Sequence, residues 1–131
     1  MTTDLDGLHG AIKRGDIIAV RKYIASGGSV STPDRNGWTP LESAAYRGNA
    51  VLVRLLLDAG ADANATPTPG GMTPLELAAM AGSLPAVKVL LKCGARTDHG
   101  GVSTAERLRG WGYGDRTRIL EAIEHARGDK G

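Results

Sequence analysis

The chain has 131 residues, of which 41% are hydrophobic and 23% are charged, and these values predict one soluble globular domain. The formal net charge is only +2 and no segment is a basic tract, which argues against nucleic acid as a partner. The single cysteine, Cys93, excludes an intrachain disulfide and a thiol cluster for a metal, and we expect neither a metal nor another cofactor.

The organisation of the chain is visible in a repeated pair, a glycine followed by a residue that can cap a helix. The pairs recur at nearly equal intervals, and they are Gly15-Asp16, Gly48-Asn49, Gly82-Ser83 and Gly114-Asp115. A further glycine follows twelve positions later in three of the units, at Gly27, Gly60 and Gly94. A period of roughly 33 residues predicts a stack of small helical units without a single closed core.

The first unit is expected to hold two helices separated by Gly15. Asp16 can cap the second helix, and Val20, Tyr23 and Ile24 follow at spacings of three and four residues. This spacing places the three side chains on one stripe of a helix, which we expect to face the core. Gly27 is expected to end the helix.

The second unit contains a strong signal for a helix start. Thr39 can accept open backbone N–H bonds, Pro40 suits the first helical position, and Glu42 can reach back to complete a capping box. The arrangement recurs in the third unit and more weakly in the fourth, at Thr73, Pro74 and Glu76, and at Ser103 with Glu106. The second helices of these units carry apolar stripes at Leu52, Val53, Leu56 and Leu57, at Val87, Leu90 and Leu91, and at Ile119, Ala122 and Ile123.

Several strings in the chain resemble the ankyrin repeat. They are Thr39-Pro40-Leu41, Leu55-Leu56-Leu57, Gly60-Ala61-Asp62-Ala63-Asn64-Ala65, Thr73-Pro74-Leu75 and Leu90-Leu91-Lys92-Cys93-Gly94-Ala95. The resemblance covers the chain from about Asp4 to about Ala126. It implies an all-α fold, an ankyrin-type α-solenoid of four helix-turn-helix repeats linked by β-turn loops. We therefore expect a single domain, 1–131, with units at roughly 4–33, 34–67, 68–97 and 98–127.

The chain departs from the family pattern in places. Glu42 and Glu76 stand where ankyrin repeats often carry histidine, and a row of functional carboxylates is one interpretation. Capping predicts the same recurrence, and we favour it. The first unit has Asp6-Gly7-Leu8-His9 in place of Thr-Pro-Leu-His, as in an N-terminal capping unit. The linker from Ala95 to Ser103 is about three residues shorter than usual, so we expect its turn to be stunted.

No constellation of residues predicts catalysis. The histidines lie in different units without a carboxylate or cysteine at ligand spacing, and they are His9, His99 and His125. The glycine-rich stretches lack the Lys-Ser/Thr of a phosphate-binding loop. We therefore predict no catalytic, cofactor-binding or metal-binding residues, whereas an enzyme or a ligand-binding protein would need a pocket that gathers such groups.

The resemblance implies a partner at the loop tips and at the exposed side of the first helix of each unit. The predicted partner-binding residues are Lys13, Arg14, Arg35, Trp38, Tyr46, Arg47, Met72, Met80 and Trp111, and Ala81 and Val102 occupy matching positions. Tryptophan, tyrosine and arginine are enriched at binding hot spots. Packing between units is the alternative for Trp38, Met72 and Met80, and Trp111 can instead close the end of the stack.

The sequence thus predicts a module that binds another protein through its concave face and loop tips. A stand-alone inhibitor, such as an immunity protein that neutralises a toxin, is the alternative within this class. Nucleic-acid binding through Lys13, Arg14, Arg35 and Arg47 ranks lower, because 14 acidic residues accompany the basic ones. No export signal is visible and the apolar runs are too short to span a membrane, so we expect a cytoplasmic protein without a membrane partner.

Overall fold

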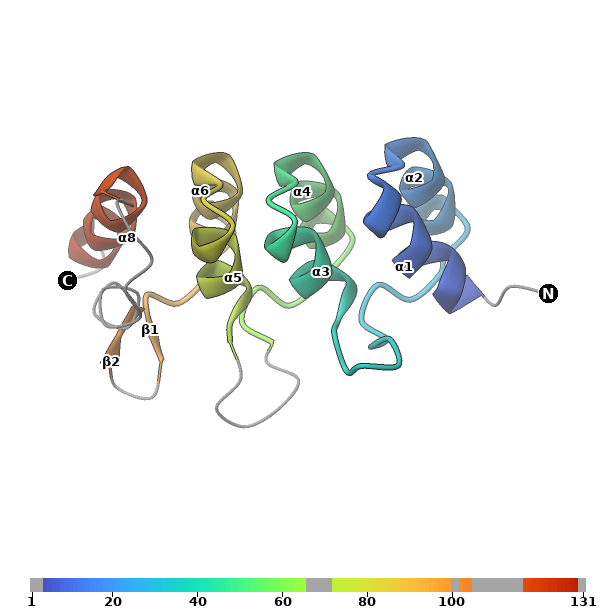
Figure 1. Ribbon diagram of the computed structural model, residues 1–131, viewed down its shortest axis with the longest axis horizontal. Coiled ribbons are helices and arrows are strands. Elements are labelled where there is room, and N and C mark those ends of the chain that lie inside the picture. Colours follow the sequence, from blue (N-terminus) through green and yellow to red (C-terminus); the bar gives the residue numbers. More distant parts are fainter. Residues whose placement is uncertain (1–3, 66–71, 100–101, 105–116, 130–131) are drawn as a thin grey trace.

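The computed structural model describes residues 4–65, 72–99, 102–104 and 117–129. Within these residues the helices are α1 (Asp4–Arg14), α2 (Ile17–Ala25), α3 (Pro40–Tyr46), α4 (Ala50–Asp58), α5 (Pro74–Met80), α6 (Leu84–Lys92) and α8 (Thr117–Asp129). Two short strands, β1 (Asp98–His99) and β2 (Val102–Ser103), lie before α8 in the chain. Figure 1 shows the helices side by side in a row along the longest axis, with the connecting loops projecting from one edge of the row.

The predicted helix starts are confirmed at α3 and α5. The Thr39 side chain accepts a bond of 3.2 Å from the Glu42 backbone N–H, and the Glu42 carboxylate accepts one of 3.0 Å from the Thr39 N–H. Thr73 and Glu76 make the same reciprocal pair at 3.1 Å and 2.9 Å. A proline occupies the first turn of each helix, where its missing N–H leaves no bond unmade.

The predicted joints within the helix pairs are also confirmed. The side chains of Asp16, Asn49 and Ser83 accept bonds from backbone N–H groups in the first turns of α2, α4 and α6. Gly48 shows why a glycine precedes such a cap. Its φ is +68°, and a Cβ there would lie 3.0 Å from the Cβ of Ser83, so both the backbone conformation and the close approach of the next unit require glycine.

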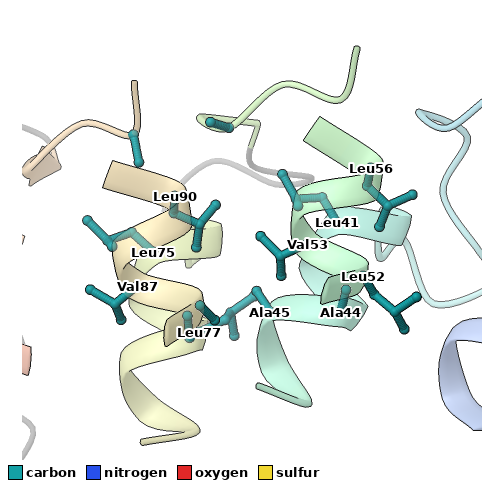
Figure 2. Close-up of a cluster of buried hydrophobic side chains, with 14 of the residues drawn as sticks. Leu41, Ala44, Ala45, Leu52, Val53, Leu56, Leu75, Leu77, Val87 and Leu90 are labelled. Atoms are coloured by element: carbon teal, nitrogen blue, oxygen red, sulfur yellow. The ribbon is translucent and has the colours of Figure 1, made fainter. Parts of the chain in front are cut away.

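The helices form two layers. In one layer α1 contacts α3 and α3 contacts α5, and in the other α2, α4, α6 and α8 follow one another. Figure 2 shows the apolar side chains between them, and these fully or almost fully buried residues include Leu41, Leu52, Val53, Leu56, Leu75, Val87 and Leu90. Ala44 and Ala45 on α3 are fully buried, which lets neighbouring helices approach closely. The core is therefore continuous from pair to pair, as the repeat predicts.

Polar side chains also connect successive helix pairs. The Asn64 amide donates to the Gly94 carbonyl at 3.2 Å and accepts from the Arg96 N–H at 2.7 Å. The Ser83 hydroxyl donates to the Gly48 carbonyl at 2.9 Å. These bonds join groups that lie about one repeat apart in the chain, so they fix how one unit sits on the next.

One expectation needs adjustment, and one linker adds a feature that the sequence did not predict. Tyr23 is only half-buried, because its ring lies against Gly28 and its hydroxyl donates to the Ser29 carbonyl at 2.9 Å, whereas the stripe predicts a core residue. The short linker after Ala95 forms an antiparallel pair in which Asp98 lies opposite Ser103, so two strands are added to an otherwise helical fold.

The last unit is described in part. On α8, Ile119 and Ile123 are buried and Ala122 is half-buried, which agrees with the predicted stripe. The predicted joint at Gly114-Asp115 and the weaker capping pair of Ser103 with Glu106 involve positions outside the described residues. Among the helices that the structure describes, none combines the length and hydropathy needed to cross a lipid bilayer.

Candidate functional site

A closed turn places Trp38 immediately before α3. The Asp34 carboxylate accepts bonds from the N–H groups of Asn36, at 2.9 Å, and Trp38, at 3.0 Å. The Asp34 N–H donates to the Trp38 carbonyl at 2.8 Å, and the Gly37 N–H donates to the Asp34 carbonyl at 3.0 Å. Gly37 has a φ of +85°, which the turn needs and which a glycine adopts without strain. Because hydrogen bonds join Asp34 to both the N–H and the carbonyl of Trp38, the turn fixes the backbone of Trp38.

Trp38 and Tyr46 form an aromatic pair across the two ends of α3. Their ring centroids are 5.4 Å apart and the rings meet edge to face, with an interplanar angle of 70°. Trp38 is half-buried against the core, whereas 53% of Tyr46 is exposed. Such pairs contribute about 0.5–1.5 kcal/mol beyond the area that they bury. Trp38 thus packs against the core and at the same time contacts the exposed Tyr46 ring.

Two adjoining hollows surround this pair. The first has a volume of about 170 Å³ and is lined by Lys13, Asp34, Asn36, Trp38, Ser43, Tyr46 and Arg47. The second, of about 290 Å³, is lined by His9, Gly10, Lys13, Asp34, Arg35 and Asn36. Lys13, Asp34 and Asn36 belong to both hollows, so the surface runs without a break from α1 across the turn to the end of α3.

The charged groups around the hollows are mainly positive. Lys13, Arg35 and Arg47 are exposed, and the single carboxylate among the lining residues is that of Asp34. One oxygen of Asp34 is already occupied by two backbone N–H groups. Arg14 is exposed as well, and its guanidinium lies over Gly10 at the edge of the second hollow. The hollows therefore offer aromatic surface beside several cations.

Glu42 lies beneath the hollows and does not open onto them. Only 2% of the residue is exposed, and burial raises the pKa of its carboxyl, although the hydrogen bonds from Thr39 act in the opposite direction and the nearby charge of Asp34 adds to the rise. Glu76 is fully buried. Both carboxylates accept hydrogen bonds at the starts of their helices. They therefore act as helix caps and do not form an exposed row of functional carboxylates.

The remaining predicted residues lie elsewhere. Met72 and Met80 are half-buried and pack against the core, and they do not line the hollows. Ala81 is exposed, Val102 lies in β2, and Trp111 lies outside the described residues. The hollows are also lined by residues that the sequence did not indicate, namely Asp34, Asn36, Ser43, His9 and Gly10. The Asp-Arg-Asn-Gly string before a Thr-Pro start could have indicated the first two, because aspartate often closes such turns onto its own backbone.

The side chains that could hold a metal or perform chemistry remain dispersed. In the part of the chain that the structure describes, no group of three or more His, Cys, Asp or Glu residues could hold a metal ion. His9 is 4% exposed, and its Nε2 lies 3.0 Å from the Thr32 carbonyl, which joins the first helix pair to the following loop. Cys93 is exposed at the end of α6.

Stacked helix pairs with projecting loops define an α-solenoid repeat protein. The chain belongs to the ankyrin repeat family, whose model, described as ankyrin repeats in three copies, matches residues 8–100. Ankyrin repeats are generally protein-interaction modules, and their fold is not generally catalytic.

The curated relatives carry ankyrin repeats within much longer chains. Over 54 residues the chain is 52% identical to the ankyrin repeat, SAM and basic leucine zipper domain-containing protein 1 of Carollia perspicillata. It is 50% identical over the same length to the proteins of that name from Rhinolophus ferrumequinum and Mus musculus. Each match covers 41% of this chain and 11% of the relative. The similarity therefore concerns the repeats and not the other domains of those proteins.

Proposed function

We propose that the chain binds a partner protein through the face formed by its loop tips and first helices, without catalysis. The observation that carries the proposal is the Trp38–Tyr46 pair, which is held by a closed turn and flanked by Lys13 and Arg47. Tryptophan, tyrosine and arginine dominate binding energies when they gather at one place. Here all three types lie around one hollow.

The rigidity of the turn supports this function energetically. Each flexible side chain that becomes fixed on docking costs about 0.5–1.5 kcal/mol. The backbone of Asp34–Trp38 is already bonded, and Tyr46 already rests against Trp38. A partner would therefore meet a preorganised aromatic surface and would lose little affinity to ordering.

The cations favour a partner that presents acidic groups. Arg35 is exposed within the turn and lines one hollow, Arg47 is exposed after α3 and lines the other, and Lys13 lines both. Guanidinium groups can bind carboxylates through two parallel hydrogen bonds. The complementary surface is thus an apolar or aromatic side chain that enters beside Trp38, with acidic residues next to it.

A photo-crosslinking experiment tests the position of this surface. The full chain would carry p-benzoyl-phenylalanine at Arg47 or, as the matched control, at Ile18, which is 69% exposed on α2 in the other layer. After irradiation in an extract of the native host, we expect discrete protein adducts from position 47 and none of the same mass from position 18. Equal adducts from both positions, or none from position 47, would reject the assignment. An activity assay on the captured partner would then distinguish an adaptor from an inhibitor.

A further inference from the structure

A third, larger hollow lies between α6 and α8, at the C-terminal end of the other helix layer. Its volume is about 770 Å³, and it shares no lining residue with the hollows around Trp38. Figure 1 shows α8 beside α6 at the end of the row. The two surfaces are therefore independent, and binding at one does not occupy the other.

The floor of this groove is aliphatic and follows two helical stripes. Leu84 and Leu91 are seven positions apart on α6, and Ala122 and Ala126 are four apart on α8. These spacings place each pair on one face of its helix. The α6 helix has nine residues, so the groove is about 13 Å long, which corresponds to between two and three turns of a helix laid along it.

The walls of the groove are mainly cationic. Lys88 and Lys92 stand one turn apart on α6, and Arg118 faces them from α8. All three side chains are exposed, and Glu121 is the acidic residue among the lining residues, with His125 on the same wall. The α6 wall is thus cationic, whereas Glu121 offsets the charge of Arg118 on the α8 wall, and the lining residues together carry more cations than carboxylates.

A comparison with the preceding unit shows that this charge is a local feature. Lys88 and Lys92 occupy the positions that Arg54 and Asp58 hold on α4, one repeat earlier in the chain. There the two side chains form an ion pair of 3.4 Å, so the surface is locally neutral. On α6 both positions are lysine, and the face that borders the groove therefore gains two net positive charges.

We infer that the groove between α6 and α8 is a docking site for an amphipathic helix of a partner protein, with an apolar stripe flanked by acidic residues. A groove between two helices accepts a third helix through side chains at i, i+3 or i+4, and i+7. The leucines and alanines of the floor receive the stripe, and Lys88, Lys92 and Arg118 face the acidic flanks. Charge complementarity selects this occupant over a neutral or basic helix.

A pair of designed peptides tests the inference on the full chain. The probe is an acetylated helical peptide of leucine, alanine and glutamate, with leucine at spacings of three and four and glutamate on both flanks of the stripe. Its counterpart carries lysine in place of every glutamate. We expect the acidic peptide to bind at least tenfold more tightly by fluorescence anisotropy. NMR amide shifts should concentrate on α6 and α8.

Charge-reversal variants assign the binding to this groove. Lys88→Glu with Lys92→Glu should weaken the acidic peptide at least tenfold. The control, Arg21→Glu with Lys22→Glu, makes the same change in net charge on exposed residues of α2 and should leave affinity within twofold. Circular dichroism establishes that both variants remain folded. Equal binding of the two peptides, equal weakening by both variants, shifts that spread over other helices, or binding only to phosphatidylserine vesicles would each overturn the inference.

Discussion

The starts of α3 and α5 are built alike but present different side chains. Each has a threonine cap, a proline in the first turn and a glutamate that completes the capping box. Trp38 precedes one helix and Met72 the other at the equivalent position, and Tyr46 and Met80 are the equivalent last residues of the two helices. The aromatic pair leaves Tyr46 53% exposed, whereas both methionines pack half-buried against the core.

This difference shows that the repeat fixes the backbone position of a side chain, whereas the chemistry of the side chain decides whether it stays exposed or packs against the core. The edge-to-face contact with Trp38 holds Tyr46 outward, where Lys13 and Arg47 join it around a hollow. At the end of α5, the position equivalent to Arg47 is Ala81, which brings no charge. The same backbone thus yields a cationic aromatic surface in one unit and a largely apolar contact in the next.

The largest effect is expected from the part that the two units share. Leu41 is 2% exposed and Leu75 is 0% exposed, and replacing either with alanine removes a buried side chain. Each replacement should lower the free energy of unfolding by about 2–5 kcal/mol, because a buried leucine leaves a cavity. Urea denaturation followed by circular dichroism measures both. Val51→Ala, at a residue that is 48% exposed, is the control and should cost clearly less. A loss at Leu41 no greater than at Val51 would contradict a shared core.

A pair of double variants tests whether the aromatic pair and the two methionines act differently. Trp38→Ala with Tyr46→Ala should weaken binding of the crosslinked partner by about 2 kcal/mol or more, roughly 30-fold, because anchors of this type dominate interfaces. Met72→Ala with Met80→Ala should act chiefly on unfolding, since both side chains pack against the core. Isothermal titration calorimetry and thermal denaturation separate the two effects. An unchanged affinity of the aromatic variant, with its fold intact, would remove Trp38 and Tyr46 from the interface.

The smallest effect concerns Glu42. Burial raises the pKa of its carboxyl above the ordinary value of 4.5. At a pH between 4.5 and the raised pKa, the native state therefore binds more protons than the unfolded state. The contribution of Glu42 to the free energy of unfolding therefore decreases as the pH rises through this interval. Glu42→Gln keeps an oxygen for the Thr39 N–H but carries no charge.

The stability of the Glu42→Gln variant relative to the natural chain should consequently be higher at pH 7 than at pH 4. Urea denaturation at both pH values measures this relative stability. Thr39→Ala removes the hydroxyl that caps Glu42 and serves as a control, because it should destabilise the chain at both pH values. A relative stability of the glutamine variant that falls from pH 4 to pH 7 would show that the sign of the pKa shift is wrong.

Local signals in the sequence predicted the scaffold well. The threonine, proline and glutamate of each helix start act over three residues, and Asn49 likewise caps α4 through the Leu52 N–H three residues later, so their geometry depends little on distant parts of the chain. The candidate site was predicted less completely. The sequence indicated Trp38, Tyr46 and Arg47, but not that Lys13 of α1 lines the same hollow as these residues, because that depends on how α1 and α3 pack.

The amino-acid sequence by itself determined the repeat, the ends of the helices, and the apolar stripes on Leu52, Leu56 and Leu90, because a helix cap and a helical period are local properties. The tertiary structure alone decided which surfaces stay open. It brought Lys13 of α1 beside Tyr46 of α3, and it left a groove between α6 and α8 where Lys88 faces Arg118. Such surfaces arise from the distance and angle between packed helices, which side chains from several units set together.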